Sequence, residues 1–177
     1  MEILKFDSSH INDIIVHFLS LSAQDRYLRF AHSPTDEQIR RYISESIVKK
    51  DDHWFGCLYQ GKIVGSIHVS IGSGVAEFGL TTDPIYRGQK IGQRLFGCGY
   101  ELVISQGIEQ IYLACLSTNR PMRHIAKKFG LAVISHGPET EASVTISYPV
   151  PLNRINEIKA SIIDKNIGKD NSNDCKI

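Results

Sequence analysis

The segment from Ala76 to Leu95 most strongly constrains the fold, because it predicts a strand, a glycine-bearing turn and a helix in direct succession. The strand pattern ends at Thr82, Arg87-Gly88 and Gly92 belong to the turn, and apolar residues then recur at helical spacing. Such a turn directs several backbone N–H groups at one point, at the positive end of a helix dipole. The segment therefore predicts a binding site for a phosphate or pyrophosphate group.

Length, charge and cysteine spacing narrow the class of protein. The 177 residues suffice for one well-packed core and are too few for two ordinary domains. A formal net charge of +1 gives no broad basic surface, which argues against a nucleic-acid partner. The four cysteines lack the spacing of a metal site or a disulfide framework, so no metal is expected. Because the sequence has neither a secretory signal nor a membrane-spanning apolar run, we expect a cytoplasmic protein with no membrane partner.

Hydrophobic periodicity predicts alternating helices and strands. Helices are expected at 9–22, at 35–49 after a capping box, after Ile91, and from Pro121 to Gly130. Strands are expected at 53–59, 62–71, 75–82, 108–116, 131–136 and 143–150. Gln60-Gly61 predicts a hairpin turn, and the apolar run at 108–116 predicts a strand buried on both faces. The fold class is α/β (α+β).

The motif Arg87-Gly88-x-x-Ile91-Gly92, with this order of elements, resembles the GNAT superfamily of acyl-CoA N-acyltransferases. The resemblance implies a central, mixed, mostly antiparallel sheet flanked by about four helices. Leu21–Phe30 and Ala76-Glu77-Phe78 are also similar to the acetyltransferase domain of bacterial protein lysine acetyltransferases. We expect a GNAT N-acetyltransferase domain at 1–150 and a C-terminal extension at 151–177. The polar end of this extension, 166–177, is expected to be disordered.

The resemblance implies that acetyl-CoA binds at the loop as co-substrate. Gly88 and Gly92 would let the backbone approach the pyrophosphate closely. Arg87 would contact phosphate or brace the loop. The family usually has a glycine where this chain has Lys90, which would need an unhindered backbone angle or would add charge beside the phosphates. The residues implied to bind the cofactor are Leu80, Thr81, Thr82, Arg87, Gly88, Gln89, Lys90, Ile91, Gly92, Gln93 and Asn119.

The same resemblance implies a role for the end of the strand that precedes the loop. The backbone of Leu80, Thr81 and Thr82 would pair with the pantetheine arm along an open strand edge. The Leu80 N–H would hold the oxyanion of the tetrahedral intermediate. The alternative is complete pairing of this strand within the sheet.

Glu77 is the candidate general base, and it matches the glutamate proposed for this role in the lysine acetyltransferases. A carboxylate beside the attacking amine can take its proton, directly or through a water. Strand parity places Glu77 on the same face as Gly79, which leaves space next to the carboxylate. The alternative is a solvated glutamate, or a partner for an arginine such as Arg26 or Arg29.

Four further positions have both a functional and a purely structural interpretation. Asn119 would contact the cofactor, cap a helix, or do both. Many relatives carry a tyrosine acid at the position of Ala126, so water would protonate the leaving thiolate here. A lone histidine is more often structural, so His68 and His124 are minor catalytic candidates.

The implied function is direct transfer of acetyl from acetyl-CoA to an amine in a ternary complex, without a covalent enzyme intermediate. The alternative is a non-catalytic acyl-CoA-binding module that acts as a sensor. The acceptor stays open among protein lysine, an N-terminus, a polyamine and a small metabolite, and a homodimer is also left open.

Overall fold

The structure is a computed structural model that describes residues 1–163. Seven strands form one sheet: β1 Glu2–Phe6, β2 Asp52–Tyr59, β3 Lys62–Gly72, β4 Val75–Thr82, β5 Gln110–Leu116, β6 Ala132–His136 and β7 Glu139–Thr145. Their order in the sheet is β1-β2-β3-β4-β5-β7-β6. All neighbouring pairs are antiparallel except β4 and β5, which are parallel. The expected mixed, mostly antiparallel sheet is confirmed.

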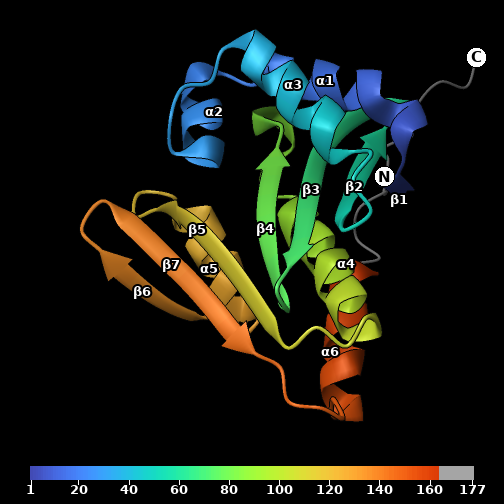
Figure 1. Ribbon diagram of the computed structural model, residues 1–177, viewed down its shortest axis with the longest axis vertical. Coiled ribbons are helices and arrows are strands. Elements are labelled where there is room, and N and C mark those ends of the chain that lie inside the picture. Colours follow the sequence, from blue (N-terminus) through green and yellow to red (C-terminus); the bar gives the residue numbers. More distant parts are fainter. Residues whose placement is uncertain (164–177) are drawn as a thin grey trace, which may run out of the picture.

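Helices cover both faces of this sheet. They are α1 Ile11–Ser20, α2 Ala23–Phe30, α3 Asp36–Ser46, α4 Ile91–Ser105, α5 Arg120–Lys128 and α6 Leu152–Ile162, with short 3-10 helices at Ser8–His10 and Pro84–Tyr86. In Figure 1, α1 and α3 lie on one side of β2–β4 and α4 lies on the other, while α2 lies to the left of the upper end of β4. Each face therefore has its own hydrophobic cluster.

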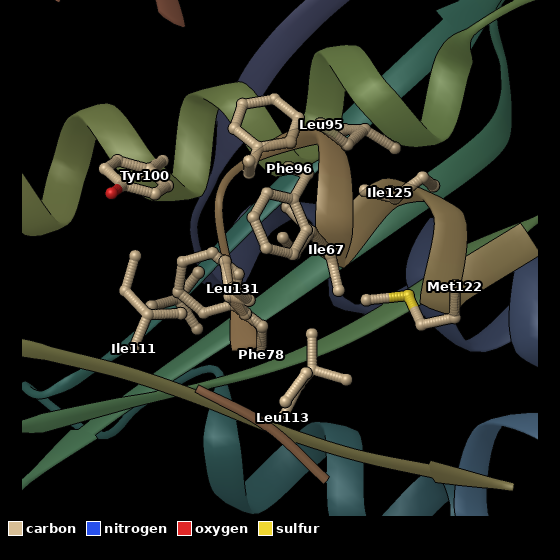
Figure 2. Close-up of a cluster of buried hydrophobic side chains, with 14 of the residues drawn as sticks. Ile67, Phe78, Leu95, Phe96, Tyr100, Ile111, Leu113, Met122, Ile125 and Leu131 are labelled. Carbon is tan, nitrogen blue, oxygen red and sulfur yellow. The ribbon is translucent and has the colours of Figure 1, made fainter. Parts of the chain in front are cut away.

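The larger cluster fixes α4 against β4. Leu95, Phe96 and Tyr100 are at most 3% exposed, and Phe96 points from α4 toward Phe78 of β4 (Figure 2), with their ring centroids 4.9 Å apart. Burying one large apolar side chain contributes about 1.5–3 kcal/mol. This packing holds the start of α4 at the end of β4. Under α1 and α3, the fully buried Trp54 forms the centre of the smaller cluster.

Several local predictions are confirmed and others are wrong. Gln60 and Gly61 both have positive φ, 50° and 73°, as the predicted hairpin turn requires. The strand at 108–116 is not buried on both faces: its side chains alternate, because one face of β5 lines a cavity. The last strand is β7 at Glu139–Thr145, not 143–150, because the turn falls at Gly137-Pro138 and the polar residues after it alternate across the sheet. The sequence prediction also omitted β1 and α2.

The described part of the C-terminal extension packs on the domain. Ile158 of α6 is 2% exposed, and Arg94 Nε donates to Ile162 O over 2.8 Å. The domain boundary at residue 150 stays a prediction, and the prediction for 166–177 lies outside the described residues. Within 1–163, no helix combines the length and apolar character needed to cross a bilayer.

Candidate active site

The two parallel strands at the centre of the sheet separate soon after they meet. Their pairing covers three positions and ends at Glu77 opposite Tyr112. From Phe78 to Thr82, β4 pairs with β3 alone. Figure 1 shows β4 and β5 diverging from this point. The far end of β4 therefore presents one open edge.

The hydrogen-bond pattern gives the direction of the amides on this edge. Asp83 N donates to Val64 O over 2.9 Å, and hydrogen-bonded pairs alternate along an antiparallel ladder. Odd-numbered residues of β4 thus direct their N–H groups toward β3. Leu80 and Thr82 direct theirs toward the open edge, where the backbone of a bound molecule can pair with them.

A cavity of about 330 Å³, here called the cofactor cavity, lies between this edge and the start of α4. The side chain of the N-cap residue Lys90 makes no capping hydrogen bond, so it does not accept from the first N–H groups of α4. Unsatisfied N–H groups at a helix start form an anion site, and these residues fit a cofactor that carries a pyrophosphate. Every residue that the sequence implied for cofactor binding lines this cavity except Gln89.

The loop before α4 contains two left-handed residues. Gly88 has φ +80°, and Lys90 has φ 59° and ψ 12°. Lys90 thus adopts the conformation that glycine adopts most easily, at a cost of about 1–2 kcal/mol for an L side chain. The lysine therefore keeps the backbone path of the loop despite its Cβ.

Arg87 and Asn119 both have structural contacts. Arg87 Nη2 forms an ion pair with Asp25 Oδ1 of α2, and Asp25 is itself held by the N-cap residue Ser22. Arg87 therefore braces the loop, and its contact with phosphate stays a prediction. Asn119 Oδ1 accepts from Met122 N over 3.2 Å, which makes it the cap of α5. Its cofactor role stays a prediction as well.

A second cavity of about 510 Å³, here called the acceptor cavity, lies on the other side of the open edge. Carboxylates outnumber cations in its lining. The carboxylates are Glu45, Asp52, Glu77, Glu139 and Glu141, and the cations are Arg29 and Lys49. Its electrostatic field therefore favours a positively charged guest.

The two cavities meet at a small set of residues. Both are lined by Leu28, Arg29, Leu80, Asn119 and Met122. Leu80 is thus the point of β4 that a molecule in either cavity can reach. Ala126, the position at which the resemblance implied a tyrosine in many relatives, is fully buried in the core.

The family model for the acetyltransferase (GNAT) family matches residues 16–131, which is more than half of the chain. The chain belongs to this acetyltransferase family. It is accordingly an acyltransferase enzyme. No curated protein matches the chain.

Solved structures share the fold of this GNAT protein at low identity. The GNAT domain of S. lividans PAT has a TM-score of 0.72 and 13% identity, with 81% of this chain and 89% of that chain covered. The ribosomal-protein-S5-alanine acetyltransferase from Vibrio fischeri has a TM-score of 0.67 and 14% identity, with 84% of this chain and 94% of that chain covered. PaiA N-acetyltransferase from Thermoplasma acidophilum, solved in complex with coenzyme A, has a TM-score of 0.59 and 19% identity. The match covers 82% of this chain and 99% of that chain.

Glu77 of this GNAT protein lies on the acceptor side of β4. Its side chain is exposed and lines the acceptor cavity, at the last position paired with β5. The arginines considered as its partners are engaged elsewhere: Arg26 pairs with Asp36 over 2.6 Å, and Arg29 donates to Tyr42. Within 1–163, Glu77 makes no ion pair. Its role as base stays a prediction.

The sequence prediction missed a chain of hydrogen bonds on the wall of the acceptor cavity. Arg29 Nη2 donates to Tyr42 Oη over 2.7 Å, and Tyr42 Oη lies 2.6 Å from His68 Nδ1. The hydrogen bonds end at His68, whose Nε2 faces Asp52 Oδ2 at 3.4 Å without a hydrogen bond within 1–163. Ser70 Oγ donates to Asp52 Oδ1 over 2.6 Å. Strand parity could have placed His68 and Glu77 on one face, but Tyr42 lies on α3, so no local pattern links it to them.

Burial sets the protonation of this chain. It lowers the pKa of His68 to about 4, with the nearby Arg29 charge as a second cause. Burial likewise raises the pKa of Tyr42. His68 is therefore neutral and Tyr42 a phenol near neutral pH. Neither group is poised to take a proton from an amine, whereas the carboxylate of Glu77 is exposed in the same cavity.

Proposed function

We propose that this protein transfers the acetyl group of acetyl-CoA to a cationic amine, by direct attack in a ternary complex. The observation that carries the proposal is the meeting of two cavities at the open edge of β4. One has an uncapped helix start that suits a pyrophosphate, and the other has Glu77 beside Leu80. The family membership supports the same reaction.

The reaction divides between two residues of β4. Glu77 takes a proton from the ammonium, and the amine nitrogen then forms a bond with the thioester carbon. The carbonyl electron pair moves to oxygen, where the Leu80 N–H stabilises it. That pair then re-forms the carbonyl, the carbon–sulfur bond breaks, and the sulfur leaves with its electrons. A water takes the second proton from the nitrogen, so that a neutral amide forms, and a proton from water protonates the thiolate.

The carboxylates of the acceptor cavity support an acceptor that is positively charged and lacks a nearby carboxylate. Glu139 and Glu141 of β7 face the same cavity as Glu77 and make no ion pair within residues 1–163. A lysine side chain of a protein or a polyamine fits this field better than a free amino acid, whose carboxylate would be repelled. The cytoplasm is the compartment we propose for this reaction.

The test combines calorimetry with a coupled assay for CoA release. Acetyl-CoA should bind and raise the melting temperature by mass action. Lysine peptides and polyamines should release CoA faster than free amino acids, and added salt should weaken the preference. If the folded protein binds no acetyl-CoA, the proposal fails. If it binds acetyl-CoA and no amine in the panel releases CoA, the direct transfer fails and a sensor role takes its place.

A further inference from the structure

Arg29 is the one charged residue, within 1–163, that lines both cavities. It projects from α2 onto β4, and a Cβ atom at Gly79 would collide with its Nη2 and Cζ atoms. Gly79 precedes Leu80, whose N–H points to the open edge. The guanidinium therefore lies where the cofactor side and the acceptor side of the site meet.

The Arg29 charge has no anion partner in the described part of the chain. Nη2 donates to the neutral Tyr42 hydroxyl, and Nε is buried without an acceptor. The Cζ atom lies 4.9 Å from the Phe30 ring centroid and 5.7 Å from that of Tyr42. Within 1–163, no carboxylate lies within ion-pair distance of it. A partly buried cation without an anion is costly, so an anion that arrives from outside the chain would be bound favourably.

Buried groups fix the orientation of this cation. Arginine only donates, so the Tyr42 oxygen accepts from Arg29 and its proton goes to His68 Nδ1. His68 then carries its ring proton on Nε2, toward Asp52. The His68 ring stacks on Trp54 with centroids 4.5 Å apart. Arg29 is thus held by a chain that ends in the core of the domain.

The carboxylates of the acceptor cavity limit which anions reach Arg29 from that side. Glu77, Glu139 and Glu141 would repel a substrate that arrives with a negative charge. An anion that forms at this junction without crossing the acceptor field is the thioester oxygen, during attack by the amine. Such an anion exists only after the substrates have bound.

We propose that Arg29 is a second donor to the oxyanion, beside the Leu80 N–H. The inference rests on the proposed function. The positive charge of Arg29 would stabilise the negative carbonyl oxygen that forms together with the carbon–nitrogen bond. The oxygen loses this negative charge when the carbonyl re-forms and sulfur leaves. Tyr42 and His68 are positioning residues that hold the guanidinium.

The main test compares Arg29→Gln and Arg29→Lys with wild type. We expect Arg29→Gln to bind acetyl-CoA within about threefold of wild type and to lower kcat by roughly 10²–10³-fold, the usual effect of losing one oxyanion donor. Infrared difference spectra of isotope-labelled bound acetyl-CoA give a second readout, because a lost donor should return the carbonyl stretch toward its value in free acetyl-CoA. Arg29→Lys, which keeps the charge, should recover part of both.

Two further variants keep the test decisive. Gly79→Ala should displace the guanidinium while keeping the arginine, with the same direction of change in kcat and spectrum. Arg26→Gln removes an arginine of the same helix that lines neither cavity, and should change stability without changing the rate per folded molecule. If Arg29→Gln does not fold, Gly79→Ala becomes the test. The carbonyl stretch of acetyl-CoA bound to Gly79→Ala then decides whether the inference holds.

Several results would overturn the inference. One is an unchanged kcat and carbonyl stretch in an active enzyme without Arg29. Another is a rise in KM for the amine with no change in kcat, which would make Arg29 an acceptor contact. A third is a variant that loses activity with succinyl-CoA as donor and keeps its activity with acetyl-CoA. This result would mean that Arg29 binds the carboxylate of an acyl group. If the wild-type protein binds no acetyl-CoA, the proposed function itself fails, and the inference fails with it.

Discussion

The two cavities that meet at Leu80 differ in how the chain builds them. The cofactor cavity is made largely by one continuous segment, from the end of β4 through the loop to the first turn of α4. The acceptor cavity takes side chains from three helices, α2, α3 and α5, and from five strands, β2, β3, β4, β5 and β7. Backbone groups of a short segment depend on local conformation alone, whereas converging side chains depend on the register of the whole sheet. Changes on the two sides should therefore affect different steps.

The largest effect expected on the acceptor side is that of Glu77→Gln. If Glu77 is the base, the variant should keep its affinity for acetyl-CoA and lose roughly 10²–10⁴-fold in turnover. The loss should shrink as pH rises, because more of the amine is then already neutral. A pH–rate profile on one good acceptor, with melting curves, measures this. Equal rates across pH would remove Glu77 from the mechanism, and lower stability at an unchanged rate would make it structural.

On the cofactor side, Gly92→Val should produce the opposite pattern. A Cβ atom there lies 3.0 Å from Ile125 Cδ1 and 3.1 Å from Leu80 Cδ2, so a valine would crowd the lining of the cofactor cavity. We expect acetyl-CoA affinity to fall by about tenfold or more, or about 1.4 kcal/mol per decade. Calorimetry measures the change. Gly72→Val, which meets open space at the end of β3, is the matched control. Unchanged affinity in Gly92→Val would contradict the pyrophosphate site.

Acid should destabilise the domain through two buried histidines on the face of the sheet that α1 and α3 cover. Burial lowers the pKa of both His17 and His68 to about 4, and His17 Nε2 lies 2.8 Å from Thr81 Oγ1 under β4. Because the pKa falls on folding, their stabilising effect is present above about pH 6.5 and is lost as pH falls toward 4. Each should contribute a slope of about 1.4 kcal/mol per pH unit in this window.

Denaturant unfolding between pH 4 and 7 measures that slope. His68→Asn should remove about half of it, because His17 still contributes, while substitution of the exposed His136 should leave it unchanged. A wild-type slope near zero between pH 4 and 6.5 would mean that these histidines are not buried as described.

The smallest effect concerns the brace between the two sides. Arg87, half exposed, pairs with the buried Asp25 of α2, and exposed pairs contribute about 1 kcal/mol or less. We expect Arg87→Gln and Asp25→Asn to weaken acetyl-CoA binding alike, by a few-fold, because both free the loop from α2. A much larger loss for Arg87→Gln alone would show a direct phosphate contact instead.

The accuracy of the sequence prediction follows the same division. The hairpin turn at Gln60-Gly61 and the capping box of α3 were correct because short-range steric and hydrogen-bonding preferences determine them. The strand at 108–116 was wrongly expected to be buried on both faces, because an apolar run does not reveal that a cavity replaces packing on one side. For β7, the alternation of Glu139, Thr140, Glu141 and Ala142 was missed since its outward residues face that cavity.

The sequence by itself determined the phosphate-type loop, the strand before it and the family resemblance, because each depends on residues that are neighbours in the chain. The tertiary structure decided where β4 and β5 separate, and it brought Arg29, Tyr42 and His68 together from α2, α3 and β3. The sequence analysis named Arg29 only as an alternative partner for Glu77. Its position over Gly79 follows from packing between elements about 50 residues apart, which local periodicity does not encode.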